Sequence, residues 1–336
     1  MNLSRLHRSL AVTAVLALVG SLAACGTSNS GTSTADGGLN VSVSFYPIQY
    51  LVESIGGSHV KVTSATPANT EPHDYELSPN DIAALGKADI ITYVKGFQPS
   101  LDDAVQKVSG PTVLDLSGDV ELVHHEGVGG HHHHEHEHEH EAEASAEATE
   151  AEHHHEHEHE HEEAGQATDP HFWLDPQRMV SAAKAIEASL AKADPTNAAD
   201  YKANLKTLTD KLTAIDTSYS TSLSTCERKT IVTSHNAFGY LADRYGLSVT
   251  SITGVDPESE PSLADLANVK KVVQETGTTT IFTEELLSPK SAELVAKETG
   301  ATTAVLSPME SKPEAGDYAA SMDANLSALK TALSCK

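Results

Sequence analysis

Four histidines lie outside both the histidine-rich middle of the chain and its first 38 residues: His59, His73, His171 and His235. His59 opens a predicted strand, and we interpret it as a surface residue. The other three lie at junctions, in "NTEPHDYELSP", in "DPHFWLDP" and directly after "TIVTS". In parallel α/β sheets, ligands bind beyond the carboxyl ends of the strands. These three imidazoles are therefore candidate metal ligands.

A carboxylate is a candidate for the fourth position. Glu284 ends the predicted strand "TTTIFTE", and three imidazoles with one oxygen suit tetrahedral Zn²⁺. A manganese site would favour more carboxylate oxygen. Glu284 could equally accept a hydrogen bond from a ligand or cap a helix, and these interpretations stay open. Glu71, Asp74 and Asp169 could accept the second ring N–H of each imidazole and fix its tautomer.

Strand-like and helix-like segments alternate on both sides of a helical middle. "LNVSVSF" and "HVKVTSA" have strand patterns, and "SPNDIAALGKA" begins a helix with Ser78 as N-cap, Pro79 next and Asp81 completing a capping box. The same alternation returns after residue 226. Such βαβ units predict parallel sheets. We therefore expect an α/β protein with two lobes, residues 39–174 and 226–336.

The middle, residues 175–225, is predicted to be helical. Two helices begin at the pairs Asp175–Pro176 and Asp194–Pro195. The second helix carries an apolar stripe with spacings of four and three, made of Tyr201, Leu205, Leu208, Leu212, Ile215 and Tyr219. Its length would be on the order of 45 Å. We expect a long rigid linker helix, with the metal site in the cleft between the lobes.

The first 25 residues have the pattern of an export signal. Arg5 and Arg8 precede the apolar stretch "LAVTAVLALVGSLAA". The following "LAAC" resembles the lipobox of bacterial lipoproteins, which implies cleavage before Cys25 and lipid attachment to its thiol; an ordinary secretory signal is the alternative. Residues 26–38 form a flexible tether. We expect an exported protein, lipid-anchored to the outer face of the bacterial cell membrane without a spanning helix.

The acidic charge is concentrated in one segment. The net charge is −26, and fifteen Glu but no Lys or Arg lie between Glu121 and Glu163. A nucleic-acid binder would show a basic face, so we expect no nucleic-acid partner.

The same segment is rich in histidine. Residues 121–167 are predicted to form a loop that is disordered without metal, because hydrophobicity is low and charge is high. Neutral imidazoles, with a reference pKa of about 6.5, could capture, buffer or sense zinc there, although a tolerated insertion is the alternative. The candidate low-affinity ligands are His131, His132, His133, His134, His136, His138, His140, His153, His154, His155, His157, His159 and His161.

Two further cysteines, Cys226 and Cys335, follow this segment. An exported compartment permits a disulfide between them, and unpaired thiols are the alternative. The chain-entropy relation gives a loop of about 110 residues roughly 4–5 kcal/mol of stabilisation.

Four motifs together resemble one family. "EPHDYELSPNDIAAL", "DPHFWLDP", "TSHNAFGYLADRYGL" and "IFTEELLSPKSAELVAKETGA" resemble, in order and spacing, the zinc-binding lipoproteins of bacterial ABC importers, within the metal-specific solute-binding proteins. The resemblance implies two α/β lobes joined by a long helix, and metal ligation by His73, His171 and His235. Manganese-binding relatives commonly have a carboxylate at the third position, so the histidine here favours zinc. No Asp matches their fourth ligand, which leaves Glu284 or a water.

The resemblance also implies a function. Zinc-binding members often carry a His- and acid-rich insertion near the metal entrance. We expect a monomer without catalytic activity that passes Zn²⁺ to the permease subunit of an ABC transporter. Alternatives are a manganese-binding transport protein, an adhesin lipoprotein and a zinc hydrolase. A hydrolase would need a general base and a substrate pocket, and the sequence contains no "HExxH".

Overall fold

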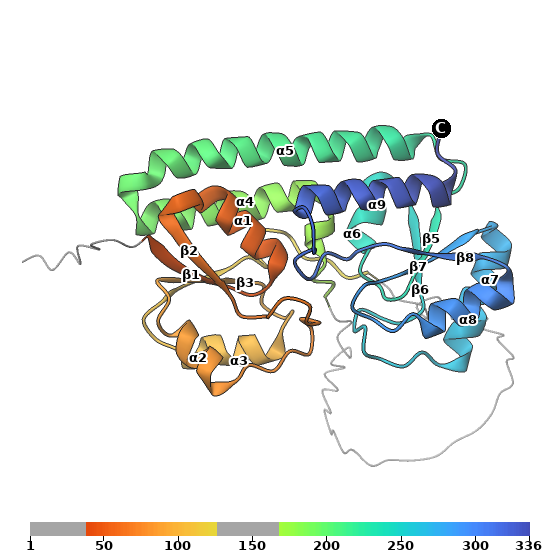
Figure 1. Cartoon of the computed structure of the whole chain (residues 1–336), viewed down its shortest axis with the longest axis horizontal. Coiled ribbons are helices and arrows are strands. Elements are labelled where there is room, and N and C mark those ends of the chain that lie inside the picture. Colours follow the sequence, from red (N-terminus) through yellow and green to blue (C-terminus); the bar gives the residue numbers. More distant parts are fainter. Residues whose placement is uncertain (1–37, 126–167) are drawn as a thin grey trace, which may run out of the picture. The chain divides into compact units, whose positions relative to one another are not determined.

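Parallel strands alternate with helices in the computed structural model of the chain, which describes residues 38–125 and 168–336 (Figure 1). The predicted signal peptide, Cys25, the tether up to residue 37 and the thirteen candidate low-affinity histidines lie outside the described residues. The first sheet has the order β2-β1-β3-β4, with every pair parallel. Its lobe contains β1 (Leu39–Val43), α1 (Tyr46–Gly56), a 3₁₀ turn (Gly57–His59), β2 (Val60–Ser64), α2 (Pro79–Leu85), β3 (Ile90–Tyr93), α3 (Pro99–Lys107) and β4 (Thr112–Asp115).

The second sheet repeats this arrangement. Its order is β6-β5-β7-β8, again with every pair parallel. The predicted fold class, two parallel α/β lobes, is therefore confirmed. This lobe contains β5 (Thr230–Thr233), α6 (Gly239–Tyr245), β6 (Ser248–Ser251), α7 (Leu263–Thr276), β7 (Thr280–Thr283), α8 (Lys290–Thr299), β8 (Thr302–Val305) and α9 (Tyr318–Leu333).

Helix starts follow the capping signals in two of three predicted places. The capping box of Ser78 and Asp81 forms at α2, and the Asp175 side chain accepts a hydrogen bond from a backbone N–H at the start of α4 (Pro176–Ala193). The third place differs. Residues Pro195–Asn197 form a 3₁₀ turn, and α5 (Ala198–Ser224) begins after it. The Asp194 carboxylate instead accepts hydrogen bonds from the side chains of Asn197 and Tyr201.

Helix α5 runs across both lobes, with α4 and α9 packed beneath it (Figure 1). Its 27 residues correspond to a length of about 40 Å. Most of the predicted stripe is buried, including Tyr201, Leu212 and Tyr219, and only Leu205 is half-buried. One continuous hydrophobic cluster includes residues from both sheets and from these helices. The long helix is thus packed along its length against the lobes that it connects.

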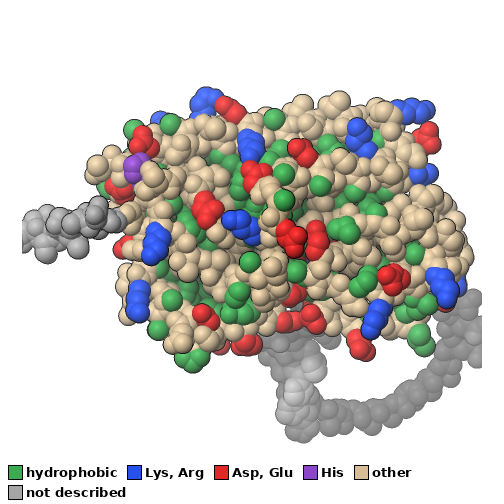
Figure 2. Space-filling view, in the orientation of Figure 1, with side chains coloured by type: hydrophobic (Ala, Val, Ile, Leu, Met, Phe, Trp, Pro, Cys, Tyr) green, Lys and Arg blue, Asp and Glu red, His purple; other side chains and the backbone are tan. Residues whose placement is uncertain are grey.

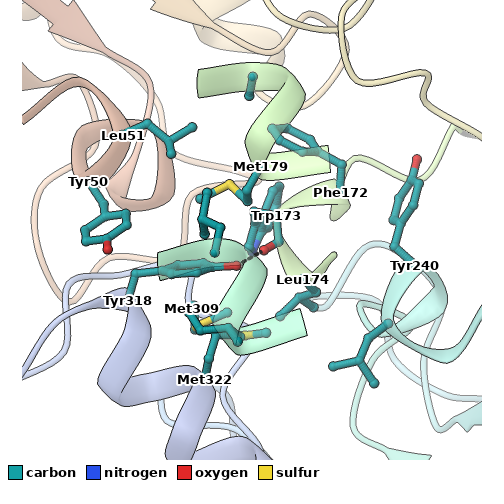
Figure 3. Packing of buried hydrophobic residues seen from close by; sticks show 14 of the residues in the cluster. Tyr50, Leu51, Phe172, Trp173, Leu174, Met179, Tyr240, Met309, Tyr318 and Met322 are labelled. Carbon is teal, nitrogen blue, oxygen red and sulfur yellow. Dashed lines mark hydrogen bonds between the residues drawn. The ribbon is translucent and has the colours of Figure 1, made fainter. Parts of the chain in front are cut away.

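Trp173 lies where the lobes meet within this cluster (Figure 3). It belongs to a 3₁₀ turn, Phe172–Leu174, just before α4. Its indole N–H donates to the carbonyl of Pro308 at 2.7 Å, and its own carbonyl accepts from the Tyr318 hydroxyl at 2.6 Å. Both partners belong to the second lobe. The segment after His171 and the segment before α9 are therefore fixed to each other in a dry environment.

Charged side chains of both signs are interspersed on the face shown in Figure 2, where Lys and Arg lie singly among Asp and Glu. Within residues 38–125 and 168–336, no helix combines the length and apolar character needed to cross a membrane.

The predicted disulfide between Cys226 and Cys335 is present. The two cysteines also form an isolated backbone bridge, which joins the end of α5 to the residues after α9. We expect the double substitution Cys226→Ser/Cys335→Ser to lower the free energy of unfolding by roughly 2–5 kcal/mol, because the unfolded chain regains loop entropy. Denaturant titration measures this change. The wild-type protein under reducing conditions is the control, and we expect it to unfold at the same denaturant concentration as the double variant. Equal stability of the oxidised and reduced wild-type proteins would contradict the prediction.

Candidate metal centre

Four side chains from the two lobes converge on one point. The ligand atoms of His73, His171, His235 and Glu310 all lie within 4.8 Å of one another. Each residue follows a strand or begins a turn: His73 lies in the loop after β2, His171 precedes the turn at Phe172, His235 follows β5, and Glu310 follows β8. His171 and His235 are fully buried, Glu310 is 4% exposed and His73 is half-buried. A cation bound here would be largely removed from water.

The distances between these atoms fit tetrahedral zinc. Bonds of about 2.0–2.1 Å from a central Zn²⁺ require ligand atoms about 3.3 Å apart. The Nε2 atom of His171 lies 3.2 Å from that of His73 and 3.3 Å from that of His235. The Oε1 atom of Glu310 lies 3.4, 3.2 and 3.6 Å from the Nε2 atoms of His73, His171 and His235. Five of the six edges are thus close to those of a zinc tetrahedron.

Glu284 does not occupy the fourth position, which corrects the expectation from sequence. Its Oε2 lies 2.7 Å from Nδ1 of His235, on the side of the ring away from the cluster, and its Oε1 accepts a hydrogen bond from the His235 backbone N–H at 3.2 Å. Glu284 therefore supports a candidate ligand. Glu310 was missed, although it follows the predicted strand "TTAVLSP" and the rule on strand ends applies to it equally.

Among the predicted hydrogen-bond acceptors, Asp169 lies within hydrogen-bond distance of a ring nitrogen of His171. Its Oδ1 lies 2.7 Å from Nδ1 of His171 and accepts a hydrogen bond from the His171 backbone N–H at 2.8 Å. Burial would raise the pKa of Asp169, but the neighbouring His171 and His125 outweigh it and lower the pKa to about 2. Glu71 accepts from the backbone N–H groups of His73 and Asp74, not from a ring.

The loop that carries His73 is held by buried groups. The Gln98 side chain donates to the hydroxyl of Thr66 at 2.7 Å and to the carbonyl of Pro72 at 3.0 Å. The His73 ring stands edge-on to Phe97, with centroids 4.6 Å apart. Across the lobes, the backbone N–H of Asn69 donates to the Ser311 hydroxyl at 2.7 Å. This bond joins the loop of His73 to the loop of Glu310.

Protons balance the charges of the cluster when no metal is bound. Burial lowers the pKa of His73. Burial also opposes the charged form of His235, but Glu284 and Glu310 outweigh it and raise its pKa to about 10. Asp169 likewise raises the pKa of His171 against the effect of burial. Although burial opposes it, close contacts with the three imidazoles keep the pKa of Glu310 well below its usual range. A metal ion must therefore displace a proton from His235.

A cavity of about 520 Å³ borders the cluster on the side of the second lobe. Its lining includes Glu310, Glu284, Glu314, Lys312, Ser311 and Asn69. Carboxylates on its wall favour the approach of a cation.

Comparison with known proteins gives a consistent result. Residues 41–332 match the family described as periplasmic zinc-uptake complex component A, ZnuA. The high-affinity zinc uptake system protein ZnuA of Bacillus subtilis (strain 168) is 36% identical over 325 residues, which cover 94% of each chain. The zinc-binding protein AdcA of Streptococcus pyogenes serotype M3 is 35% identical over 302 residues. That match covers 88% of this chain and 56% of AdcA, so the chain spans about half the length of that relative.

A solved structure agrees with the fold. The laminin-binding protein Lmb of Streptococcus agalactiae, described as bifunctional with adhesin and metal transporting activity, matches with a TM-score of 0.72 at 28% identity. The match covers 88% of this chain and 100% of that structure.

Substitution can distinguish the role of Glu284 from that of Glu310. We expect Glu284→Gln to weaken zinc binding about 10- to 100-fold, because the orientation and basicity of His235 depend on the carboxylate beside its Nδ1. We expect Glu310→Gln to weaken binding more, because it removes the charged oxygen of the cluster itself. Competition with a high-affinity chelator in the full chain measures the tightest site. The exposed neighbour Glu285 provides the control Glu285→Gln, and equal affinities of all three variants and the wild type would contradict this assignment.

Proposed function

The chain belongs to the family of zinc-uptake complex component A, and from this premise we propose that it binds Zn²⁺ outside the cytoplasm and delivers it to the permease of an ABC transporter. His73, His171, His235 and Glu310 hold the ion. A lipid on Cys25 keeps the protein at the outer face of the membrane, where it acts as a monomer. The thirteen histidines between His131 and His161 form a second set of weaker ligands that collects zinc.

The set of ligand atoms is the observation that carries this proposal. Three imidazole nitrogens and one carboxylate oxygen, with five of their six separations at 3.2–3.6 Å, suit four-coordinate Zn²⁺. Manganese prefers more oxygen ligands in an octahedral arrangement, and His235 supplies nitrogen where oxygen would be needed. The family consists of solute-binding transport components, and the proposed function includes no catalytic step.

Release of zinc requires movement of the loops that carry the ligands. The hydrophobic cluster is continuous between the lobes around Trp173, and separating the lobes there would expose it to water at a cost of roughly 25 cal/mol per Å² of apolar surface. The loops with His73 and Glu310 lie outside regular elements and are joined by the hydrogen bond between Asn69 and Ser311. Docking on a permease could separate these two loops while α5 and its neighbours keep their packing.

The first test compares the buried cluster with the histidine-rich segment. We expect His73→Ala/His171→Ala/His235→Ala to lose the tight zinc site, whereas deletion of Glu126–Glu163 retains one tight site per chain and loses only weak binding. Calorimetric titration with zinc measures both, and manganese, for which we expect a negligible response, is the metal control. Loss of tight binding in the deletion variant, or its persistence in the triple variant, would place the function in the segment instead.

Zinc affinity should fall as the pH falls. The pKa of His235 is raised to about 10, so its imidazole carries an extra proton at neutral pH without zinc, and the pKa of His171 is raised as well. Because the Nε2 atom of His235 must be free to bind metal, we expect each zinc to release at least about one proton at pH 7. The logarithm of the binding constant should then rise by at least about one per pH unit near neutrality. Calorimetry in buffers of different ionisation enthalpy counts these protons, and a count of zero would refute the assignment.

A further inference from the structure

We infer that His125 is a positioning residue for the zinc site: it holds Asp169, and through Asp169 it fixes the ring of His171. This inference rests on the proposed function. His125 is the last residue that the structure describes before residue 168, and the sequence pattern alone places it in the histidine-rich segment, residues 121–167. Its contacts separate it from that segment, because its ring is packed into the body of the protein and only 13% of its side chain is exposed.

The His125 ring is held on three sides. Its Nδ1 lies 2.6 Å from Oδ2 of Asp169, and its Nε2 lies 3.0 Å from Oδ2 of Asp243. The ring stands edge-on to Tyr240, with centroids 4.7 Å apart. A ring held by two carboxylates and an aromatic face has a defined orientation, unlike a freely rotating surface histidine.

Asp169 connects this ring to the candidate ligand. Its Oδ2 faces His125 and its Oδ1 faces Nδ1 of His171, at 2.6 and 2.7 Å. Asp169 is fully buried, so each of its oxygens needs a partner. Without His125, Oδ2 would lose that partner, and the carboxylate could rotate away from His171 to find another. The direction of the His171 Nε2 lone pair depends on this carboxylate.

The backbone around His125 is tied to both lobes. The carbonyl of His125 accepts a hydrogen bond from the side chain of Asn236, the residue next to His235, at 3.4 Å. The backbone N–H of Asp169 donates to the carbonyl of Val123 at 2.9 Å. The Tyr240 hydroxyl donates to the carbonyl of Asp169 at 2.7 Å and accepts from the N–H of Val123 at 2.8 Å. His125 thus contacts both Asp169, which holds His171, and Asn236, which is the neighbour of His235 in the chain.

Gly239 makes room for this arrangement. A Cβ atom at this position would lie 2.4 Å from the His125 ring and 2.9 Å from Oδ2 of Asp169. Any side chain there would displace the imidazole or the carboxylate. The start of α6 is therefore built to admit the pair formed by His125 and Asp169.

Two substitutions of similar size distinguish positioning from packing. His125→Asn keeps an N–H donor near the position of Nδ1, whereas His125→Leu fills similar space without a donor. We expect His125→Leu to weaken the tightest zinc site of the full chain about tenfold, the lower end of the range for groups that support ligands. We expect His125→Asn to restore most of that affinity. Chelator competition measures the affinity, and the visible absorption spectrum of the Co²⁺-loaded protein reports the ligand geometry, which simple loss of packing would leave unchanged.

Two variants complete the design. Asp243→Asn removes the exposed charge but keeps an oxygen that can accept a hydrogen bond from Nε2 of His125, so this variant should bind zinc like the wild type. Asp169→Asn alters the shared carboxylate and should be at least as weak as His125→Leu. Wild-type affinity in His125→Leu together with weak binding in Asp169→Asn overturns this inference alone, as does a failure of His125→Asn to restore affinity. Wild-type affinity in the triple variant of His73, His171 and His235 overturns the proposed function and this inference with it.

Discussion

The structure depends on charge balance in a buried space. Glu310 and Asp169 are almost completely buried, and both keep pKa values below the ordinary range. Negative charge in such surroundings is strongly unfavourable unless positive charge or hydrogen-bond donors compensate it. In the absence of metal, a proton on His235 supplies part of that compensation, and hydrogen-bond donors around the two carboxylates supply the rest. A divalent cation supplies it more completely, because it attracts the carboxylate of Glu310 and the lone pairs of all three imidazoles together.

The fold makes this concentration of charge possible by bringing distant segments to one place. Both sheets have equivalent strand orders, and the loops that follow β2, β5 and β8 carry His73, His235 and Glu310. The fourth residue of the cluster, His171, comes from the segment that enters α4, where Trp173 is hydrogen-bonded to Pro308 and Tyr318. The apolar cluster therefore holds the segment of His171 in place, while the other three residues lie in loops that follow strands.

Sequence patterns predicted the fold and three of the four side chains that converge in the cluster. The alternation of strands and helices, the Ser78 capping box and the Asp175 cap depend on local chemistry, which the sequence displays directly. The three histidines stand out because few others lie outside the histidine-rich segment. The sequence does not show in this way whether Glu284 or Glu310 faces the cluster. Both follow strands of the same sheet, and only the paths of the two loops decide which carboxylate faces the cluster and which faces Nδ1 of His235.

In the proposed site, selectivity among metal ions depends on how the rings of His171 and His235 are held as well as on which atoms they offer to the ion. Glu284 and Asp169 occupy the Nδ1 atoms of His235 and His171, so the Nε2 atoms are left to point at a common centre. The resulting separations of 3.2–3.6 Å suit a four-coordinate ion. A six-coordinate ion would need two further ligands, and the buried rings of His171 and His235 cannot withdraw to admit them without losing their carboxylate partners. In the proposed zinc site, the groups behind the rings therefore favour a four-coordinate ion, because they resist expansion of the site.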